Sequence, residues 1–268
     1  MQILLALCLL AQAKAGDKMS VSVDSEMDLE IEVRDGIGES RRVLNAIRKE
    51  KFAQQVLEVS EGRPRSVRIQ CLSSTLQKSG TDAPIAAAVP TPLSGGTFTA
   101  QRGASGWSVL DQEGNVPPPV GQGLGAWNDA ARLLPKGEAR QGSTWDVAAA
   151  DVMALFSPGA IQDAQGTISC KCEAVDANRI AVSFTGGLNG MRGEESVLKL
   201  EVKIASGELV YDLSKGRPVS LKVTGSVQSV QDMIDVFRRP NEEQEERRKV
   251  GEIVVKSRKM EVAFAFSD

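Results

Sequence analysis

Histidine is absent from this chain of 268 residues, and aromatic side chains are scarce. Phe, Trp and Tyr together make up 4% of the sequence, with a single Tyr at position 211. The absence of His excludes Ser-His-Asp triads, His general bases and every His-containing zinc or haem site. The low aromatic content argues against stacking platforms for sugars or bases. We therefore expect a protein that is not an enzyme and has no cofactor, no metal site and no catalytic residue.

Neither an excess of positive charge nor a long apolar segment is present. Lys and Arg number 32 and Asp and Glu number 35, which gives a net charge of −3. A chain without a basic excess is not expected to bind nucleic acid through its phosphates. No apolar run reaches the roughly 20 residues that a transmembrane helix requires, so no membrane span is expected.

The first fifteen residues have the pattern of a secretory signal peptide. An apolar segment at 3–10 is followed by Ala13-Lys14-Ala15, an A-x-A cleavage site, so a mature chain would begin near Gly16. The basic residues that usually precede the apolar segment are missing, because only Met1 and Gln2 stand there. We expect an exported protein, periplasmic or extracellular, with residues 1–15 removed.

Cysteine is sparse once Cys8 is removed with the leader, because only Cys71, Cys170 and Cys172 remain. Cys170 and Cys172 would lie on one face of a strand, roughly 7 Å apart, which is long for a disulfide. An oxidising compartment therefore favours a bond from Cys71 to Cys170 or Cys172. The alternative is that the thiols are small core side chains. A metal or redox role for the Cys-x-Cys pair lacks further ligands.

Alternation of apolar and polar residues with period two is the dominant pattern. The clearest example is 198–204, where Leu and Val or Ile alternate with Lys and Glu, and 219–227 repeats it after turns at 205–207 and 214–218. The same signature is present in segments throughout the chain: 21–33, 52–59, 67–71, 98–110, 167–175, 180–184 and 260–266. The expected fold is mainly β, a curved antiparallel sheet or partial barrel with a few short helices.

Helical patterns are few and short. Ser40 to Lys51 places Val43 and Ile47 four residues apart, as in a short amphipathic helix, although an extended conformation also fits. The segments 124–134 and 146–156 predict two further helices, and the acidic stretch 240–249 predicts a solvated loop or a helical turn. Pro- and Gly-rich connections at about 79–95 and 114–125 predict flexible loops inserted in one domain, 16–268.

One segment, 133–145, is more distinctive than the rest. Leu133-Leu134-Pro135 ends a helix, and Gly142 turns the chain so that Trp145 is presented to the sheet as a core anchor. With the hairpin 167–184 and the strand 207–212 that leads into Gly216-Arg217-Pro218, this segment resembles uncharacterised secreted β-proteins of bacteria, of the planctomycete type. The resemblance covers roughly residues 50–230. It implies an exported antiparallel β-protein, with an architecture similar to the half-barrel periplasmic carriers of lipoproteins and lipids.

These observations predict an exported, non-enzymatic protein that binds an apolar or protein ligand, or serves as an envelope scaffold. The expected partner is a lipid or an envelope protein, and an apolar cleft lined by Leu200, Val202, Leu221 and Val223 would support ligand binding. The alternative is a hydrolase of the cell envelope that works through two carboxylates. Acidic pairs such as Glu194-Glu195 and Glu242-Glu243 have the composition of solvated loops, so no ligand-binding residue is assigned to them.

Overall fold

A computed structural model describes residues 12–80, 86–104, 106–118, 121–156, 162–192, 198–238 and 245–268. Residues 1–11 of the expected leader and both acidic pairs, Glu194-Glu195 and Glu242-Glu243, lie outside the described residues. The part of the expected leader that the structure describes packs against the rest of the protein. Ala13 is buried, and its backbone N–H donates to the carbonyl of Gly62 over 3.1 Å.

Twelve strands and three short helical segments make up the described chain. The strands are β1 (Lys18–Asp35), β2 (Glu39–Ser60), β3 (Arg63–Gly80), β4 (Val89–Pro90), β5 (Thr97–Gly103), β6 (Gly106–Asp111), β7 (Thr144–Ala148), β8 (Gln162–Val175), β9 (Arg179–Arg192), β10 (Leu198–Asp212), β11 (Arg217–Arg238) and β12 (Glu245–Ser267). The helical segments are the 3₁₀ helices η3 (Ala126–Leu133) and η4 (Met153–Leu155) and the α-helix α1 (Ala149–Val152).

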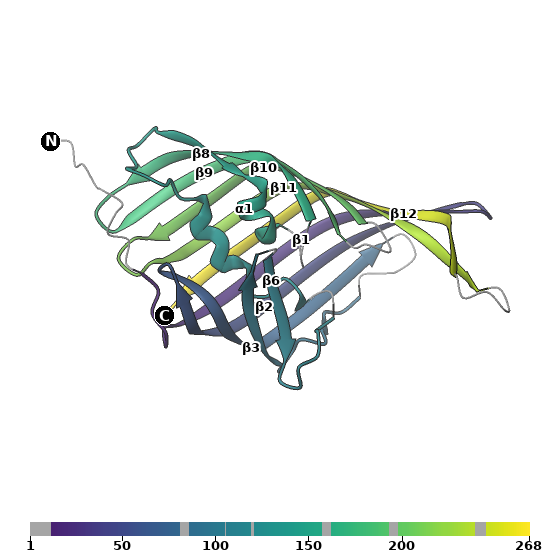
Figure 1. The fold of residues 1–268 in the computed structure, drawn as a ribbon, viewed down its shortest axis with the longest axis horizontal. Coiled ribbons are helices and arrows are strands. Elements are labelled where there is room, and N and C mark those ends of the chain that lie inside the picture. Colours follow the sequence, from purple (N-terminus) through teal and green to yellow (C-terminus); the bar gives the residue numbers. More distant parts are fainter. Residues whose placement is uncertain are drawn as a thin grey trace.

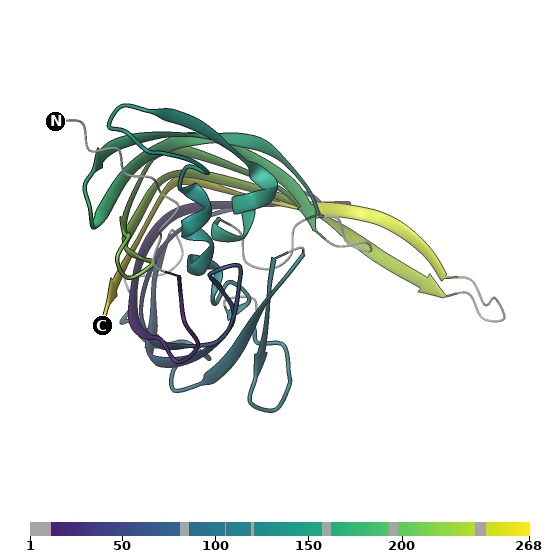
Figure 2. The same cartoon turned by 60° about the vertical axis from the view of Figure 1, so that its left-hand side comes forward.

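All strands belong to one antiparallel sheet, in the order β6-β5-β3-β2-β1-β12-β11-β10-β9-β8-β7, with β4 paired to β3. The first and last long strands of the chain, β1 and β12, pair at the middle of this order. The sheet is strongly curved, and the helical segments lie against its concave side (Figures 1 and 2). The predicted fold class, a curved antiparallel sheet with a few short helices, is confirmed.

The core lies on the concave face because alternate side chains of each strand point there. In β10, Leu200, Val202 and Ile204 are buried while the Lys and Glu between them are exposed. Bulges interrupt the pairing in several strands, for example between Ile204 and Ser206, and they increase the local bend and twist of the sheet. The period-two pattern of the sequence therefore identifies the inward face correctly.

The helix expected at Ser40 to Lys51 is wrong, because this segment is part of the long strand β2. Its residues pair with β1 along one side and, from Leu44 onward, with β3 along the other. Val43 and Ile47 are an even number of residues apart, so their spacing fits one face of a strand as well as one face of a helix. Pairing on both sides satisfies the backbone groups that a helix would have satisfied internally.

The other helical expectations are met in part. The segment 124–134 contains η3, whereas in 146–156 only α1 and η4 are helical, because residues 146–148 belong to β7. The expected loop or helical turn at 240–249 is instead strand from residue 245, as the start of β12. The expected loop 79–95 contains the end of β3, the short β4 and Leu93, whose side chain is fully buried.

The three cysteines are free and buried, so the expected disulfide is absent from the structure. Cys170 and Cys172 do share the concave face of β8, as predicted. Cys71 lies on β3, and six strands separate β3 from β8 in the sheet order. Burial raises the pKa of Cys71 to about 11 and that of Cys170 to about 12, so both stay protonated thiols at neutral pH. The thiols are small core side chains.

Trp145 is half-buried, so its predicted role as a core anchor is only partly met. Gly142 turns the chain with a φ of 84°, as expected, and the Trp145 indole N–H donates to the carbonyl of Leu133 over 3.1 Å. The two other tryptophans, Trp107 and Trp127, are the buried ones, with 5% and 4% of their surface exposed. Both pack with the segment 121–133, which covers part of the concave face.

Candidate ligand-binding groove and polar pocket

A groove of about 250 Å³ lies between the concave face of the sheet and the helical segments. Its floor comes from cross-strand rows in which residues of β1, β12 and β11 lie side by side. One row is Val23, Phe264 and Leu221, and the next is Ser25, Val262 and Val223. Met27 and Met260 form a third, paired row. Because directly opposed residues share a face, this part of the sheet presents a nearly continuous apolar surface.

The roof of the groove is made by two short stretches of chain from the helical region. Leu124, Ala126 and Trp127 come from the start of η3 and the turn before it, and 154–156 come from η4 and the residue after it. Gly125 has a φ of 86°, and a Cβ atom there would meet Ala100 and Trp107 at 3.0 Å. This position therefore requires glycine, and it allows the η3 segment to approach the sheet closely.

Trp127 fixes the roof to the sheet. Its ring stacks on Phe52 of β2 with a centroid distance of 5.5 Å, and its indole N–H donates to the Gln54 Oε1 over 2.7 Å. The Gln54 side chain also donates to the Asn128 Oδ1 over 2.9 Å, and Asn128 Nδ2 donates to the carbonyl of Gly125. All these polar groups are buried and paired, so the network holds η3 in one position on β2.

η3 is held on its other side by ion pairs. Asp129, with 5% of its side chain exposed, accepts from the Nε of Arg102 on β5 over 3.0 Å and from the Nε of Arg132 over 3.2 Å. A buried carboxylate with two guanidinium partners is compensated, and removing either partner would leave it poorly solvated. The roof is thus attached to β2 and to β5.

One charged pair lines the groove. The Arg48 Nη2 contacts Glu50 Oε1 at 2.6 Å, and 4% of the Glu50 side chain is exposed. The Ser74 hydroxyl donates to the same Glu50 oxygen over 2.7 Å, and the Thr91 hydroxyl donates to Ser74 over 2.6 Å. Glu50 is the one acidic residue among the described residues that line this groove.

Several groove residues are only half-buried, which distinguishes this part of the concave face from the rest. Val21, Val67 and Ile69 are fully buried in the core, whereas Met27, Val262 and Phe264 retain exposed apolar surface. Of the four residues predicted to line an apolar cleft, Leu221 and Val223 line this groove and Leu200 and Val202 do not, and all four are buried. An apolar surface of this kind in a concavity is suited to an apolar ligand.

Part of this site could be predicted from the sequence, and part of it could not. The segments 21–33 and 260–266 were recognised as strands, and they supply most of the floor. Arg48 and Glu50 were missed because they fall in the segment expected to be helical. Trp127 lies in the predicted helix 124–134, but nothing in the local sequence indicates that it would face β2.

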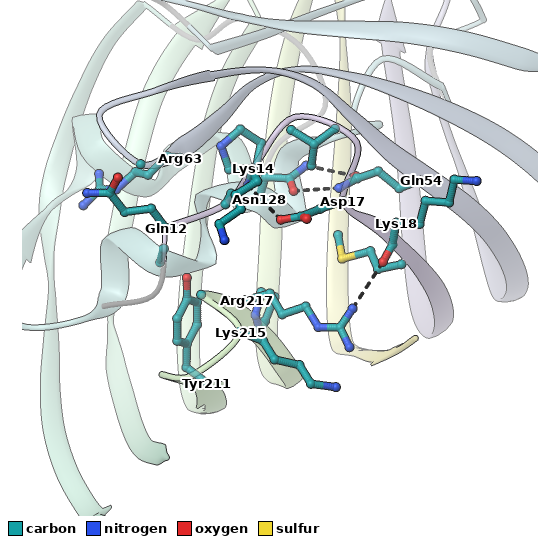
Figure 3. Close-up of a pocket in the computed structure, with 18 of the residues that line it drawn as sticks. Gln12, Lys14, Asp17, Lys18, Gln54, Arg63, Asn128, Tyr211, Lys215 and Arg217 are labelled. Carbon is teal, nitrogen blue, oxygen red and sulfur yellow. Dashed lines mark hydrogen bonds between the residues drawn. The ribbon is translucent and has the colours of Figure 1, made fainter. Parts of the chain in front are cut away.

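A second cavity, the polar pocket, lies on the other side of the Gln54–Asn128 network and has a volume of about 300 Å³. It is lined by residues from the start of β1, from β2 and β3, and from the β10–β11 turn (Figure 3). The charged residues around it are Lys14, Asp17, Lys18, Arg63, Lys215, Arg217 and Asp268. Cations therefore outnumber carboxylates in this pocket.

The two carboxylates of the polar pocket lack the features of a hydrolytic pair. Asp268 contacts Lys215 at 2.6 Å and also Arg217, and these hydrogen bonds and charges hold the pKa of Asp268 below its usual value. A general acid requires a pKa raised toward neutrality. Asp17 accepts a hydrogen bond of 2.7 Å from the backbone N–H of Lys14, so it serves a turn.

Within the described ranges, no cluster of three or more Asp, Glu, Cys or His side chains is arranged to hold a metal ion. No helix among the described residues is long and apolar enough to cross a membrane.

No protein-family model matches this chain, and no curated protein matches it. Among solved structures, a lipovitellin described for its lipid–protein interactions is similar, with 10% sequence identity and a TM-score of 0.41 over 95% of this chain. The chain spans about a quarter of the length of that lipovitellin, since 25% of it is covered. An outer membrane channel from Pseudomonas putida F1 has 10% identity and a TM-score of 0.27, covering 96% of this chain and 97% of the channel. Neither value identifies a shared function.

Proposed function

We propose that this protein is a non-enzymatic binding protein of the cell envelope that holds the hydrocarbon chain of a lipid in the groove. The observation that carries the proposal is the half-buried apolar floor formed by Met27, Val262 and Phe264 beneath a roof fixed by Trp127. A surface of this kind gains free energy when an apolar ligand removes it from water, by about 25 cal/mol per Å².

The size of the groove supports one chain. Its volume of about 250 Å³ is at or just below the lower end of small-molecule pockets, which hold ~300 to 1,000 Å³. Each methylene group transferred from water to such a site contributes about 0.8 kcal/mol before the losses of ligand freedom are subtracted. A chain of several methylenes would therefore bind measurably without any polar contact.

An exported location is part of the proposal. The apolar segment 3–10 and the Ala13-Lys14-Ala15 site support it, as does the resemblance of 133–145 and the following strands to secreted bacterial β-proteins. Intact mass of the protein from its native host is expected to show a start at or near Gly16. Recovery of a chain that begins at Met1 would contradict export by this signal.

The groove is tested by filling it. Ala154 lines the groove from η4, and the substitution Ala154→Phe would place a ring where the ligand chain is expected. Ala150 lies four residues earlier on α1, is exposed and does not line the groove, so Ala150→Phe is the matched control. We expect Ala154→Phe to weaken binding of octanol, measured by calorimetry, by about 10-fold or more, with Ala150→Phe unchanged.

Native mass spectrometry of the purified protein provides a second measurement. A co-purifying lipid that is lost in Ala154→Phe and kept in Ala150→Phe would support the proposal. Equal octanol affinities for both variants would contradict it, and octanol that fails to bind the unmodified protein would do the same.

A further inference from the structure

Tyr211 is the one tyrosine of the chain, and it lines the polar pocket from the end of β10. Only 5% of its surface is exposed, and its hydroxyl oxygen makes no hydrogen bond to the described part of the chain and is not among the fully buried atoms that lack a partner. Figure 3 shows this hydroxyl pointing into the pocket. The ring of Tyr211 is buried while its O–H reaches the cavity, where it can donate to a ligand or to solvent.

Four cations that do not belong to the expected leader line the same pocket: Lys18, Arg63, Lys215 and Arg217. Asp17 and Asp268 oppose them, which leaves two positive charges in excess. Lys215 and Arg217 share the Asp268 carboxylate, and Arg217 Nη1 also donates to the carbonyl of Lys18 over 3.4 Å. Lys18 and Arg63 make no ion pair with a described residue, so their charges are available to a ligand.

Arg63 and Tyr211 act on the same region of the pocket. Burial raises the pKa of the Tyr211 phenol, and the positive charge of Arg63 opposes this rise. Tyr211 therefore remains a neutral donor at physiological pH while Arg63 supplies charge beside it. A neutral O–H donor combined with a guanidinium is a suitable arrangement for an oxyanion, whose oxygens accept hydrogen bonds from both.

We propose that the polar pocket is a binding site for an oxyanion, a phosphate or carboxylate group, held by the Tyr211 hydroxyl and by Arg63, with Lys18 and Arg217 adding positive charge to the pocket. Residues 12–14, which also line the pocket, belong to the expected leader, and none of these four groups does. All four groups therefore remain in the chain when the leader is removed, although the pocket loses the part of its lining that residues 12–14 supply.

Two sources of the anion are consistent with this chemistry: the headgroup of an amphiphile, or a free anion. The polar pocket and the groove share one wall, because Gln54 and Asn128 line the pocket while their partner Trp127 lines the groove. A headgroup source rests on the proposed function, since the chain of the amphiphile would occupy the groove. Binding of a free anion does not depend on the proposed function.

Calorimetric titration of the full chain with inorganic phosphate, octyl phosphate and octanol distinguishes these sources. Tyr211→Phe removes the hydroxyl and keeps the buried ring, and Arg63→Gln removes one charge. Each substitution is expected to weaken phosphate or octyl phosphate binding by about 10-fold, as for the loss of a charge-assisted hydrogen bond. Binding should also weaken as salt is raised from about 20 mM to about 500 mM, because the pocket is open to solvent.

Arg65→Gln is the matched control, because Arg65 lies two residues along β3, is exposed and does not line the pocket. Octyl phosphate binding more tightly than octanol, with sensitivity to Arg63→Gln but not to Arg65→Gln, supports the site with a headgroup source. Inorganic phosphate binding as tightly as octyl phosphate, with the same sensitivity, supports it with a free anion.

The inference is overturned if neither phosphate compound binds, or if Arg63→Gln and Tyr211→Phe affect binding no more than Arg65→Gln. This failure is distinct from failure of the proposed function. If only the oxyanion site fails, octanol still binds and Ala154→Phe still weakens its binding. If only the proposed function fails, octanol does not bind and phosphate does.

Discussion

The groove and the polar pocket lie on either side of one wall and differ in almost every other respect. The groove is bounded by sheet residues from β1, β2, β11 and β12 and is apolar apart from Ser25, Arg48 and Glu50. The pocket is bounded largely by strand ends and turns, where charged side chains reach solvent. The comparison shows that position in the curved sheet determines which side chains line a cavity. Apolar residues line the middle of the concave face, which is shielded from water, and charged residues line the rim, which is not.

The wall itself is the most sensitive part of this arrangement, so its loss should have the largest effect. Trp127→Ala removes a buried ring, its stacking on Phe52 and its hydrogen bond to Gln54. We expect it to reduce the free energy of unfolding by about 3 to 5 kcal/mol, measured by denaturant titration. Trp145→Ala, at a half-buried site, should reduce it by about 1 to 2 kcal/mol. A larger loss for Trp145→Ala would contradict the assignment of Trp127 as the anchor.

The charged pair inside the groove should have the next largest effect. Glu50→Gln leaves Arg48 and Ser74 without the carboxylate they contact, and breaking a buried pair in this way costs about 2 to 4 kcal/mol. Glu58→Gln, at an exposed position of the same strand, should change stability by less than about 0.5 kcal/mol.

The double substitution Arg48→Met with Glu50→Met sharpens this prediction. It replaces both charges by apolar side chains, so it should recover much of the lost stability and increase octanol affinity. A double variant that is less stable than Glu50→Gln would show that the Arg48–Glu50 pair stabilises the fold by more than the compensation of each buried charge by the other.

The buried thiols predict a dependence on alkaline pH. The pKa of a free thiol in the unfolded chain is near 9, whereas burial raises that of Cys71 to about 11. The folded state then binds more protons than the unfolded state, so this contribution to stability is complete below pH 9 and is lost as the pH rises toward 11. Cys71→Ala should weaken this loss between pH 9 and 11. The same slope in the variant and the unmodified protein would contradict it.

Thiol accessibility provides a separate test of the same core. A thiol reagent should detect no reactive Cys among 71, 170 and 172 in the native protein and all three after unfolding. Peptide mapping without reductant that finds a disulfide from Cys71 to Cys170 or Cys172 would contradict the free thiols of the structure and support the disulfide predicted from the sequence.

The smallest effect is expected at the rim. Lys18→Gln and Arg63→Gln remove exposed charges that make no ion pair with a described residue, so each should change stability by less than about 0.5 kcal/mol. A stability loss as large as that of Glu50→Gln would show that these residues hold the fold together, and the contrast between a structural groove and an open pocket would fail.

The sequence by itself determined which face of most strands points inward. Leu200 and Val202, Leu221 and Val223, and the inward residues of 260–266 were identified by alternation, because the pleat of a strand sends successive side chains to opposite faces wherever the strand lies. Turns were equally local: Gly142 adopts a positive φ that other residues avoid.

Tertiary structure decided the conformation of 40–51 and the two cavities. The spacing of Val43 and Ile47 fits a helix and a strand alike, and only the neighbouring strands β1 and β3 supplied the hydrogen bonds that selected the extended form. The groove joins residues as distant as Ser25, Ala154 and Val262, and the pocket joins Lys18 with Tyr211 and Arg217. Their meeting depends on the curvature of the whole sheet, which arises from the twist and bulges of many strands and is not encoded at any single position.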